Sequence, residues 1–294
     1  MKNEKINYYR LDNRNYIKKH EKILRIYRKV FIKIIVENID NGKIIVLPMY
    51  KKINKISKKI ILNKLEKIDG RICVLDKKLN GLLLEFLEDK KRKCLDGKEI
   101  MKNMIYEIFV YIMKKRKTNC KLENIYIFVN EYSKINIQLI KRMAMQFKTV
   151  NIITENLRKF KYLEEELYAQ GILITVANNK KKSAKNANYI VNIDFDKELF
   201  EKYNINMNSV IINLTDEKIF YEKMFNGILV NNLNINIDKD IEILKEENYG
   251  NIENKLYIES YVIGNKFVNY DTLIKEYNIS IKELIGVRGV IENL

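Results

Sequence analysis

The sequence predicts an α/β fold with two lobes, the second of which is a doubly wound parallel sheet. Between residues 124 and 214, short apolar runs alternate with amphipathic helical stretches, which is typical of a parallel sheet covered on both faces. A smaller α/β pattern occupies the first 95 residues, and a long helical stretch begins at residue 96. With 294 residues, 47% of them hydrophobic, the chain can bury two cores.

The first lobe is expected to cover residues 1–95. A polar lead over 1–15 comes before a stretch with apolar residues at helical spacing, 16–30. Strands are expected at 44–47 and 72–75, with a basic helix from about residue 54 between them. Residues 96–117 are then expected to form one helix that bridges the lobes, because Asp96 and Glu99 have the spacing of a capping box.

The second lobe is expected to cover residues 118–220 and has the most regular pattern. Its predicted strands are 125–129, 150–154, 172–176, 189–193 and 210–214, and its predicted helices are 134–147 and 157–170. The pattern then weakens into a C-terminal α+β extension over residues 221–294. In that extension we expect strand-like pieces at 227–230 and 256–263 and a final helix at 270–277.

The stretch 124–214 resembles a Rossmann-like domain of the NAD(P)-binding type. Glu155 stands at the end of the second predicted strand, where that family often places the acid that holds a ribose. The turn after the first strand, residues 130–134, departs from the family because no glycine occurs between Gly97 and Gly171. A pyrophosphate needs glycines there for close backbone approach, and Glu131 would repel it. We therefore expect a degenerate Rossmann-like sheet that lacks the glycine-rich loop, and we predict no cofactor.

A cofactor, if one were bound, would lie at the carboxyl edge of this sheet, near Asn130, Glu155, Lys180 and Ser183. The loop 178–185 carries four lysines that could hold a phosphate, but a charged surface loop in a lysine-rich chain needs no function. Glu155 is better explained as a solvated residue or as the N-cap of the next helix than as a ribose ligand.

Asp194 and Asp196 form an Asp-x-Asp pattern directly after a predicted strand. The pattern resembles the metal and nucleotide-sugar site of some glycosyltransferases. Asp196 is at least as well explained as the N-cap of the next helix, and we predict no metal site.

The net charge of +17 is concentrated near the N-terminus. Residues 1–60 contain 17 basic and 5 acidic side chains, whereas residues 181–240 contain 8 and 9. The basic residues proposed to meet an anionic partner, either nucleic acid or an acidic protein surface, are Lys18, Lys22, Arg25, Lys29, Lys51, Lys55 and Lys58. A coding bias toward lysine and asparagine, with a single proline, explains part of the charge without any function.

Several kinds of site are excluded by the sequence. Three cysteines without a C-x-x-C pair and one histidine, His20, argue against a disulfide framework, a zinc site and a Ser-His-Asp mechanism. Neither Gly42-Lys43 nor Gly97-Lys98 is followed by Ser or Thr, so the phosphate-binding loop of NTPases is missing. No apolar run has the length of a membrane span or of a signal peptide, and we expect a cytoplasmic protein.

We therefore expect a non-catalytic regulatory, scaffolding or binding protein. Two alternatives stay open at this point: binding of nucleic acid or another polyanion through the basic N-terminal lobe, and a nucleotide- or NAD(P)-dependent enzyme. The sequence does not indicate an oligomeric state.

Overall fold

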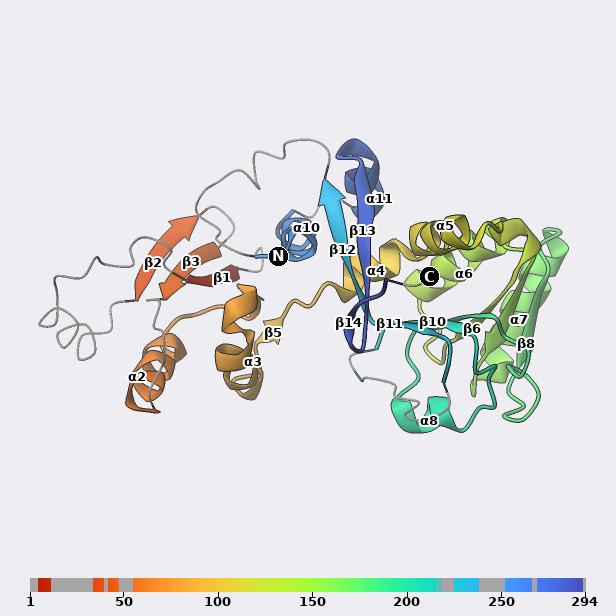
Figure 1. Ribbon diagram of the computed structural model, residues 1–294, viewed down its shortest axis with the longest axis horizontal. Coiled ribbons are helices and arrows are strands. Elements are labelled where there is room, and N and C mark those ends of the chain that lie inside the picture. Colours follow the sequence, from red (N-terminus) through yellow and green to blue (C-terminus); the bar gives the residue numbers. More distant parts are fainter. Residues whose placement is uncertain are drawn as a thin grey trace, which may run out of the picture. The chain divides into compact units, whose positions relative to one another are not determined.

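A computed structural model describes residues 5–11, 34–39, 42–47, 55–215, 217, 225–237, 252–265 and 269–292, without the side chains of 55–57 (Figure 1). The chain forms two compact units. The first consists of Met1–Gly97 and Asn236–Ile279, and the second consists of Lys98–Ile235 and Ser280–Leu294. The two-lobed α/β fold predicted from the sequence is confirmed, while the four-segment division of the chain stays a prediction.

The first unit is built around a five-stranded sheet with the order β2-β3-β1-β4-β5. Its strands are β1 (Ile6–Leu11), β2 (Ile35–Ile39), β3 (Gly42–Leu47), β4 (Ile72–Leu75) and β5 (Lys93–Cys94). Only β2 runs antiparallel to its neighbour. The predicted strands 44–47 and 72–75 therefore lie in this sheet.

Strand β1 is the central strand, which corrects the expected polar lead over residues 1–15. Asn7 and Arg10 interrupt its apolar pattern in the sequence, yet both side chains are buried. The Asn7 side-chain amide donates a hydrogen bond to the Asp69 carbonyl at 2.9 Å, so this polar group is partnered inside the fold.

Helices cover both faces of this sheet (Figure 1). Helices α2 (Lys55–Glu66) and α3 (Asn80–Asp89) pack with Tyr9 of β1 on one face. The 3-10 turn Lys77–Leu79 joins β4 to α3. Helix α10 (Asn254–Gly264) packs with Tyr8 on the other, where the Tyr8 and Tyr257 rings stack 6.4 Å apart. Helix α11 (Tyr270–Glu276) confirms the final helix expected at 270–277.

The strand expected at 256–263 is wrong, because these residues belong to α10. Its short apolar runs, 256–258 and 261–263, fit a buried strand and a buried helix equally well. In the helix the polar residues Lys255, Glu259 and Ser260 are buried as well.

The second unit begins with two short helices in place of the single bridging helix. They are α4 (Lys98–Asn103) and α5 (Ile105–Arg116), separated at Met104, whose backbone leaves helical geometry at φ −102° and ψ 17°. The Met104 amide still bonds to the Ile100 carbonyl and the Met104 carbonyl to the Ile108 amide, so the two helices continue one another. Gly97, with φ +90°, comes directly before α4, and the helix therefore starts at Lys98 rather than after Asp96.

Six parallel strands form the sheet of the second unit, in the order β11-β10-β9-β6-β7-β8. They are β6 (Asn124–Phe128), β7 (Thr149–Ile153), β8 (Ile174–Ala177), β9 (Tyr189–Asn192), β10 (Val210–Asn213) and β11 (Ile228–Val230). From the middle of the sheet, β6, β7 and β8 follow one another toward one edge, and β9, β10 and β11 follow one another toward the other edge. This is the doubly wound arrangement of a Rossmann-like sheet, as predicted.

Helices lie on both faces of this sheet (Figure 1). Helices α6 (Lys134–Gln146) and α7 (Leu157–Ala169) follow β6 and β7, while α8 (Lys197–Glu201) follows β9 on the opposite face. Successive side chains of β9 point to opposite faces of the sheet. Tyr189 packs edge-on against Phe109 of α5, whereas Ile190 belongs to the buried cluster that contains Phe200 of α8.

A three-stranded sheet with the order β12-β13-β14 completes the described fold. Its strands are β12 (Asn232–Ile237), β13 (Ile279–Gly286) and β14 (Gly289–Val290). No helix among the described residues is both long and apolar enough to cross a membrane.

Candidate functional site

The place to look for a ligand in the second unit is the carboxyl end of strands β6 and β9. These strands are hydrogen-bonded neighbours in the middle of the sheet, and the chain winds outward from them in opposite directions. In doubly wound sheets a ligand binds at such a switch point, outside the carboxyl ends of the strands. The two loops that meet here are residues 129–133 after β6 and residues 193–196 after β9.

The loop after β6 is fixed by its own hydrogen bonds. The Ser133 hydroxyl accepts from the Asn136 amide at 3.3 Å and so caps α6, and the Asn136 side chain donates to the Glu131 carbonyl at 2.9 Å. Lys102 of α4 donates to the Asn136 side-chain oxygen at 2.7 Å. The helix N-terminus, which holds a pyrophosphate in dinucleotide-binding proteins, is thus supplied with acceptors from within the chain.

Asp194 occupies the position at which an anion would be expected. Its Oδ1 accepts from the Asn130 amide and its Oδ2 from the Glu131 amide, both at 2.7 Å. Two adjacent backbone amides on one carboxylate form the kind of anion cradle that otherwise receives a phosphate. The carboxylate therefore takes up both donors that the loop after β6 directs toward the switch point.

The surroundings of Asp194 shift the pKa of its carboxyl in opposite directions. Partial burial raises the pKa of the Asp194 carboxyl above its ordinary value, and the nearby Glu131 carboxylate adds to that rise. The two amide hydrogen bonds and the positive charge of Lys102 oppose the rise. Glu131 and Asp194 together place two acidic groups where a pyrophosphate would lie, which is unfavourable for an anionic ligand.

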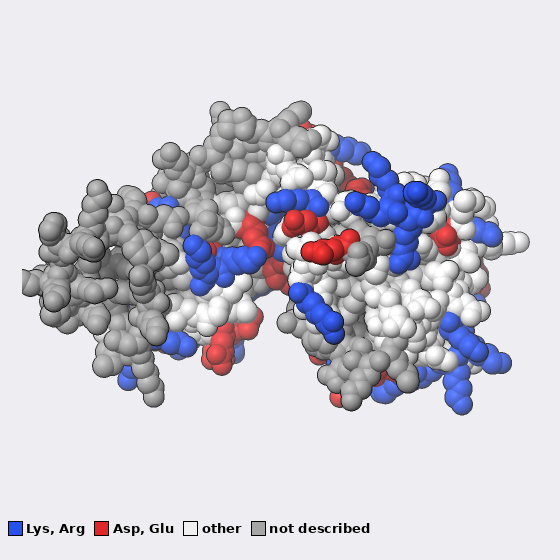
Figure 2. All heavy atoms as spheres, viewed as in Figure 1, with Lys and Arg blue, Asp and Glu red and all other residues white. Residues whose placement is uncertain are grey.

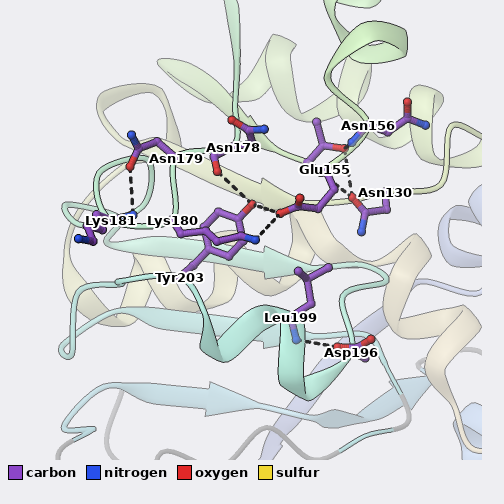
Figure 3. Close-up of polar contacts among 11 residues, drawn as sticks. Asn130, Glu155, Asn156, Asn178, Asn179, Lys180, Lys181, Asp196, Leu199 and Tyr203 are labelled. Atoms are coloured by element: carbon purple, nitrogen blue, oxygen red, sulfur yellow. Dashed lines mark hydrogen bonds and ion pairs between the residues drawn. The ribbon is translucent and has the colours of Figure 1, made fainter.

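Three of the four residues predicted to bind a cofactor come together beside this point (Figure 3). Glu155 Oε1 accepts from the Tyr203 hydroxyl at 2.8 Å and lies 3.4 Å from Lys180 Nζ. The Asn130 side-chain oxygen accepts from the Glu155 amide at 2.8 Å. Glu155 is thus bonded within the fold through both its backbone and its side chain, and Lys180 is its ion-pair partner.

Tyr203 was not singled out from the sequence, although it holds this group together. Its ring packs edge-on against Phe128 in the buried cluster under α8, and its hydroxyl also lies 3.4 Å from the Asn178 carbonyl. Burial and the Glu155 carboxylate both raise the pKa of the Tyr203 hydroxyl, so it stays protonated and acts as a donor.

Ser183 lies in the turn that links β8 to β9, apart from these contacts. Its amide donates to the Asn179 carbonyl at 2.9 Å, and Ala184 beside it is fully buried. The side chains of Lys181, Lys182 and Lys185 are exposed. Cofactor binding by Asn130, Glu155, Lys180 and Ser183 stays a prediction.

A row of asparagines at the carboxyl ends of β9, β10 and β11 was also missed. Asn192 and Asn213 are almost completely buried, and the Asn192 side chain donates to Asn213 Oδ1 at 3.0 Å. Asn213 in turn donates to Asn231 Oδ1 at 3.2 Å, and Lys98 Nζ binds the carbonyls of Asn213 and Asn231 at 2.8 and 2.6 Å. The signal was present in the sequence, since the runs 189–192, 210–213 and 228–231 each end in asparagine.

Asp196 is the N-cap of α8, with its Oδ1 accepting from the Leu199 amide at 2.7 Å. The capping interpretation of this residue is confirmed. No group of three or more His, Cys, Asp or Glu side chains suited to a metal ion occurs within the part of the chain that the structure describes.

Most of the basic residues predicted to meet an anionic partner lie outside the described residues: Lys18, Lys22, Arg25, Lys29 and Lys51. Lys55 is the first residue of α2, with its side chain outside the description, and Lys58 is exposed on the same helix. On the face of the molecule seen in Figure 2, described Lys and Arg side chains are scattered over the second unit with uncharged surface between them.

Comparison with known proteins gives no relative from which a function can be transferred. No family model matches the chain. No curated protein matches it either. Solved structures that resemble it include an ornithine carbamoyltransferase from Gloeobacter violaceus, with 8% identity over 88% of this chain and 85% of that one, at a TM-score of 0.28.

Two further structures resemble the chain to a similar degree. A chorismate mutase/shikimate 5-dehydrogenase fusion protein from Clostridium acetobutylicum is 13% identical over 93% of this chain and 96% of that one, at a TM-score of 0.29. The catalytic subunit of aspartate transcarbamoylase from M. jannaschii is 12% identical over 94% and 87%, also at 0.29. Similarities this low carry no argument about what this chain does.

Proposed function

We propose that this chain is a non-catalytic regulatory, scaffolding or binding protein, built on a Rossmann-like fold that no longer takes a dinucleotide. The observation that carries the proposal is the Asp194 carboxylate on the amides of Asn130 and Glu131, both at 2.7 Å. A dinucleotide would have to displace this carboxylate and approach a second one, that of Glu131. Neither cost exists in a loop of glycines.

The polar groups around the switch point support the same conclusion. In an enzyme, catalytic groups face a space that substrate can enter and are held ready for it. Here the Glu155 carboxylate, although exposed, is bonded to Tyr203 and Lys180, and the buried asparagines Asn192 and Asn213 bond to one another. Each of these side chains has a partner within the chain, which supports a structural role.

A thermal-shift panel tests the proposal with the full chain. The ligands are NAD, NADP, ATP, GTP, a nucleotide sugar with manganese, and short DNA and RNA, each at low and moderate salt. Ligand at a hundredfold excess over its Kd would stabilise the protein by about 2.7 kcal/mol. We expect no such shift from any of the small nucleotides, and a shift of several degrees from one of them would overturn the proposal.

Binding of a polyanion is the second candidate, supported by the net charge of +17. Lysines that neutralise phosphates release counterions, so affinity for DNA or RNA would fall steeply as salt is raised. Neutralising Lys18, Lys22, Arg25 and Lys29 together would weaken that binding. Affinity that does not change with salt would exclude this function. A cytoplasmic location is also part of the proposal, supported by three cysteines that form no disulfide in the structure.

A further inference from the structure

Two of the three cysteines lie side by side in the first unit. Strands β4 and β5 are parallel neighbours, and their register pairs Cys73 directly with Cys94. Side chains of directly paired residues point to the same face of a sheet, and adjacent strands lie about 4.8 Å apart. That separation falls within the Cα to Cα range of about 4.4–6.8 Å that a disulfide spans.

A cluster of polar groups surrounds this pair inside an otherwise apolar core. Tyr9 packs in the same buried cluster as Cys73 and Cys94. Arg92 donates to the Tyr9 hydroxyl at 2.9 Å and to the Leu65 and Ile68 carbonyls at 3.3 and 2.6 Å. The guanidinium is therefore fixed in place next to the thiols by three hydrogen bonds.

These neighbours make the first proton of the pair easy to lose and the second hard to lose. The hydrogen bond from Cys94, the charge of Arg92 and the hydrogen bond from Tyr9 lower the pKa of Cys73, against the effect of burial. The same hydrogen bond, burial, the Cys73 charge and the Glu88 carboxylate raise the pKa of Cys94. One thiolate shared between two sulfurs is the nucleophilic form of a dithiol.

We propose that Cys73 and Cys94 form a redox-active dithiol, which hydrogen peroxide converts into an intramolecular disulfide. Cys94 is partly exposed and Cys73 is fully buried, so peroxide reaches the pair at Cys94. The Cys94 thiol first passes its proton to the Cys73 thiolate beside it. The Cys94 thiolate then attacks the peroxide, the O–O bond breaks, a sulfenic acid forms on Cys94, and the released hydroxide takes the proton back from Cys73 as water. Cys73 then attacks that sulfur, the S–O bond breaks, and a second water leaves.

The net reaction is balanced: two thiols and one hydrogen peroxide give one disulfide and two waters. The two sulfurs lose two electrons and the peroxide oxygens gain them. Cys120 provides an internal comparison, because it is buried and free but lies in the second unit.

Peptide mapping of the full chain tests the proposal. The reduced protein is treated with one equivalent of hydrogen peroxide, alkylated and digested with trypsin, which separates Cys73 from Cys94 at the lysines between them. We expect one linked pair of peptides that joins Cys73 to Cys94 and is cleaved by dithiothreitol, with Cys120 alkylated. A protein in which all three cysteines remain alkylated, or in which Cys120 reacts as fast, would overturn the proposal.

Variants separate the chemistry from a failure to fold. Cys120→Ser should still form the link, whereas Cys94→Ser, at a partly exposed position, should lose it while keeping the circular dichroism of the wild type.

Arg92→Gln should slow disulfide formation, by up to about tenfold for each pKa unit that Cys73 rises. Arg71→Gln is the matched control, because Arg71 is exposed directly before β4, and it should leave the rate unchanged. Equal rates of disulfide formation in the two arginine variants would show that the Arg92 guanidinium does not activate the cysteine pair.

Discussion

At the scale of single residues, the proposed loss of dinucleotide binding rests on Asp194. Its two carboxylate oxygens receive the amides of Asn130 and Glu131, and no glycine is needed because the anion is part of the chain. Asp194 was considered from the sequence only as half of an Asp-x-Asp pattern. Its role could not be predicted, because the contact joins residues 64 positions apart and depends on how β6 and β9 pair.

Removing this carboxylate should leave two backbone donors without a partner. We expect Asp194→Ala to lower the free energy of unfolding by about 1–3 kcal/mol, measured by urea denaturation. Added pyrophosphate should recover part of the loss in the variant and have no effect on the wild type. Glu131→Ala, an exposed acid in the same loop, serves as the control and should change stability by less than about 0.5 kcal/mol. If the two variants are equally stable, the amides do not depend on Asp194.

The raised pKa of Asp194 gives a prediction for pH. Since its pKa is higher in the folded protein than in the unfolded chain, the folded protein binds more protons between the two values. The contribution of this group to stability therefore falls as the pH rises from about 4 through the folded pKa. Unfolding of the wild type and of Asp194→Asn is compared across this range. The wild type should lose stability relative to the variant as pH rises, and a relative gain would show that the hydrogen bonds outweigh burial.

At the scale of elements, the strands of the second unit could be predicted and the first strand of the chain could not. Strands such as β9 and β10 are uninterrupted apolar runs that end in asparagine, so their pattern is plain. β1 is equally buried, but Asn7 and Arg10 break its apolar run. The helix α10 was taken for a strand because its short apolar runs, 256–258 and 261–263, fit either element.

The cap of α8 allows an element-scale test. Asp196→Ala removes the acceptor for the Leu199 amide and should cost about 1 kcal/mol of stability. Glu198→Ala, in the first turn of the same helix, removes a charge without removing a cap and should cost less. Equilibrium denaturation of both variants provides the comparison. A greater loss for Glu198→Ala would contradict the capping role.

At the scale of the whole molecule, each unit is assembled from two separate stretches of the chain. Helix α10 comes from the C-terminal part, yet it covers the face of the first sheet that contains Tyr8, Ile44 and Val74. The sequence did not predict this return of the chain, since the pairing of distant segments leaves no local signal.

A chain that ends after residue 235 should therefore fail to fold its first unit stably. Loss of α10 exposes the apolar cluster of Tyr8, Ile44 and Val74 to water, at roughly 25 cal/mol for each Å² of apolar surface. The truncated protein should bind a hydrophobic dye and aggregate, whereas the full chain should not. A truncated chain that unfolds cooperatively at the same denaturant concentration as the full chain would show that α10 does not contribute to the core.

We propose that the internal carboxylate of Asp194 takes the place of the pyrophosphate of a dinucleotide. Calorimetric titration of NAD into the full chain at neutral pH, with NADP titrated in parallel, decides this. We expect no saturable heat for either cofactor up to millimolar concentration. Saturable binding that is lost when Glu155 is changed to Ala would contradict it, and would show that the carboxyl edge of the sheet still receives a cofactor.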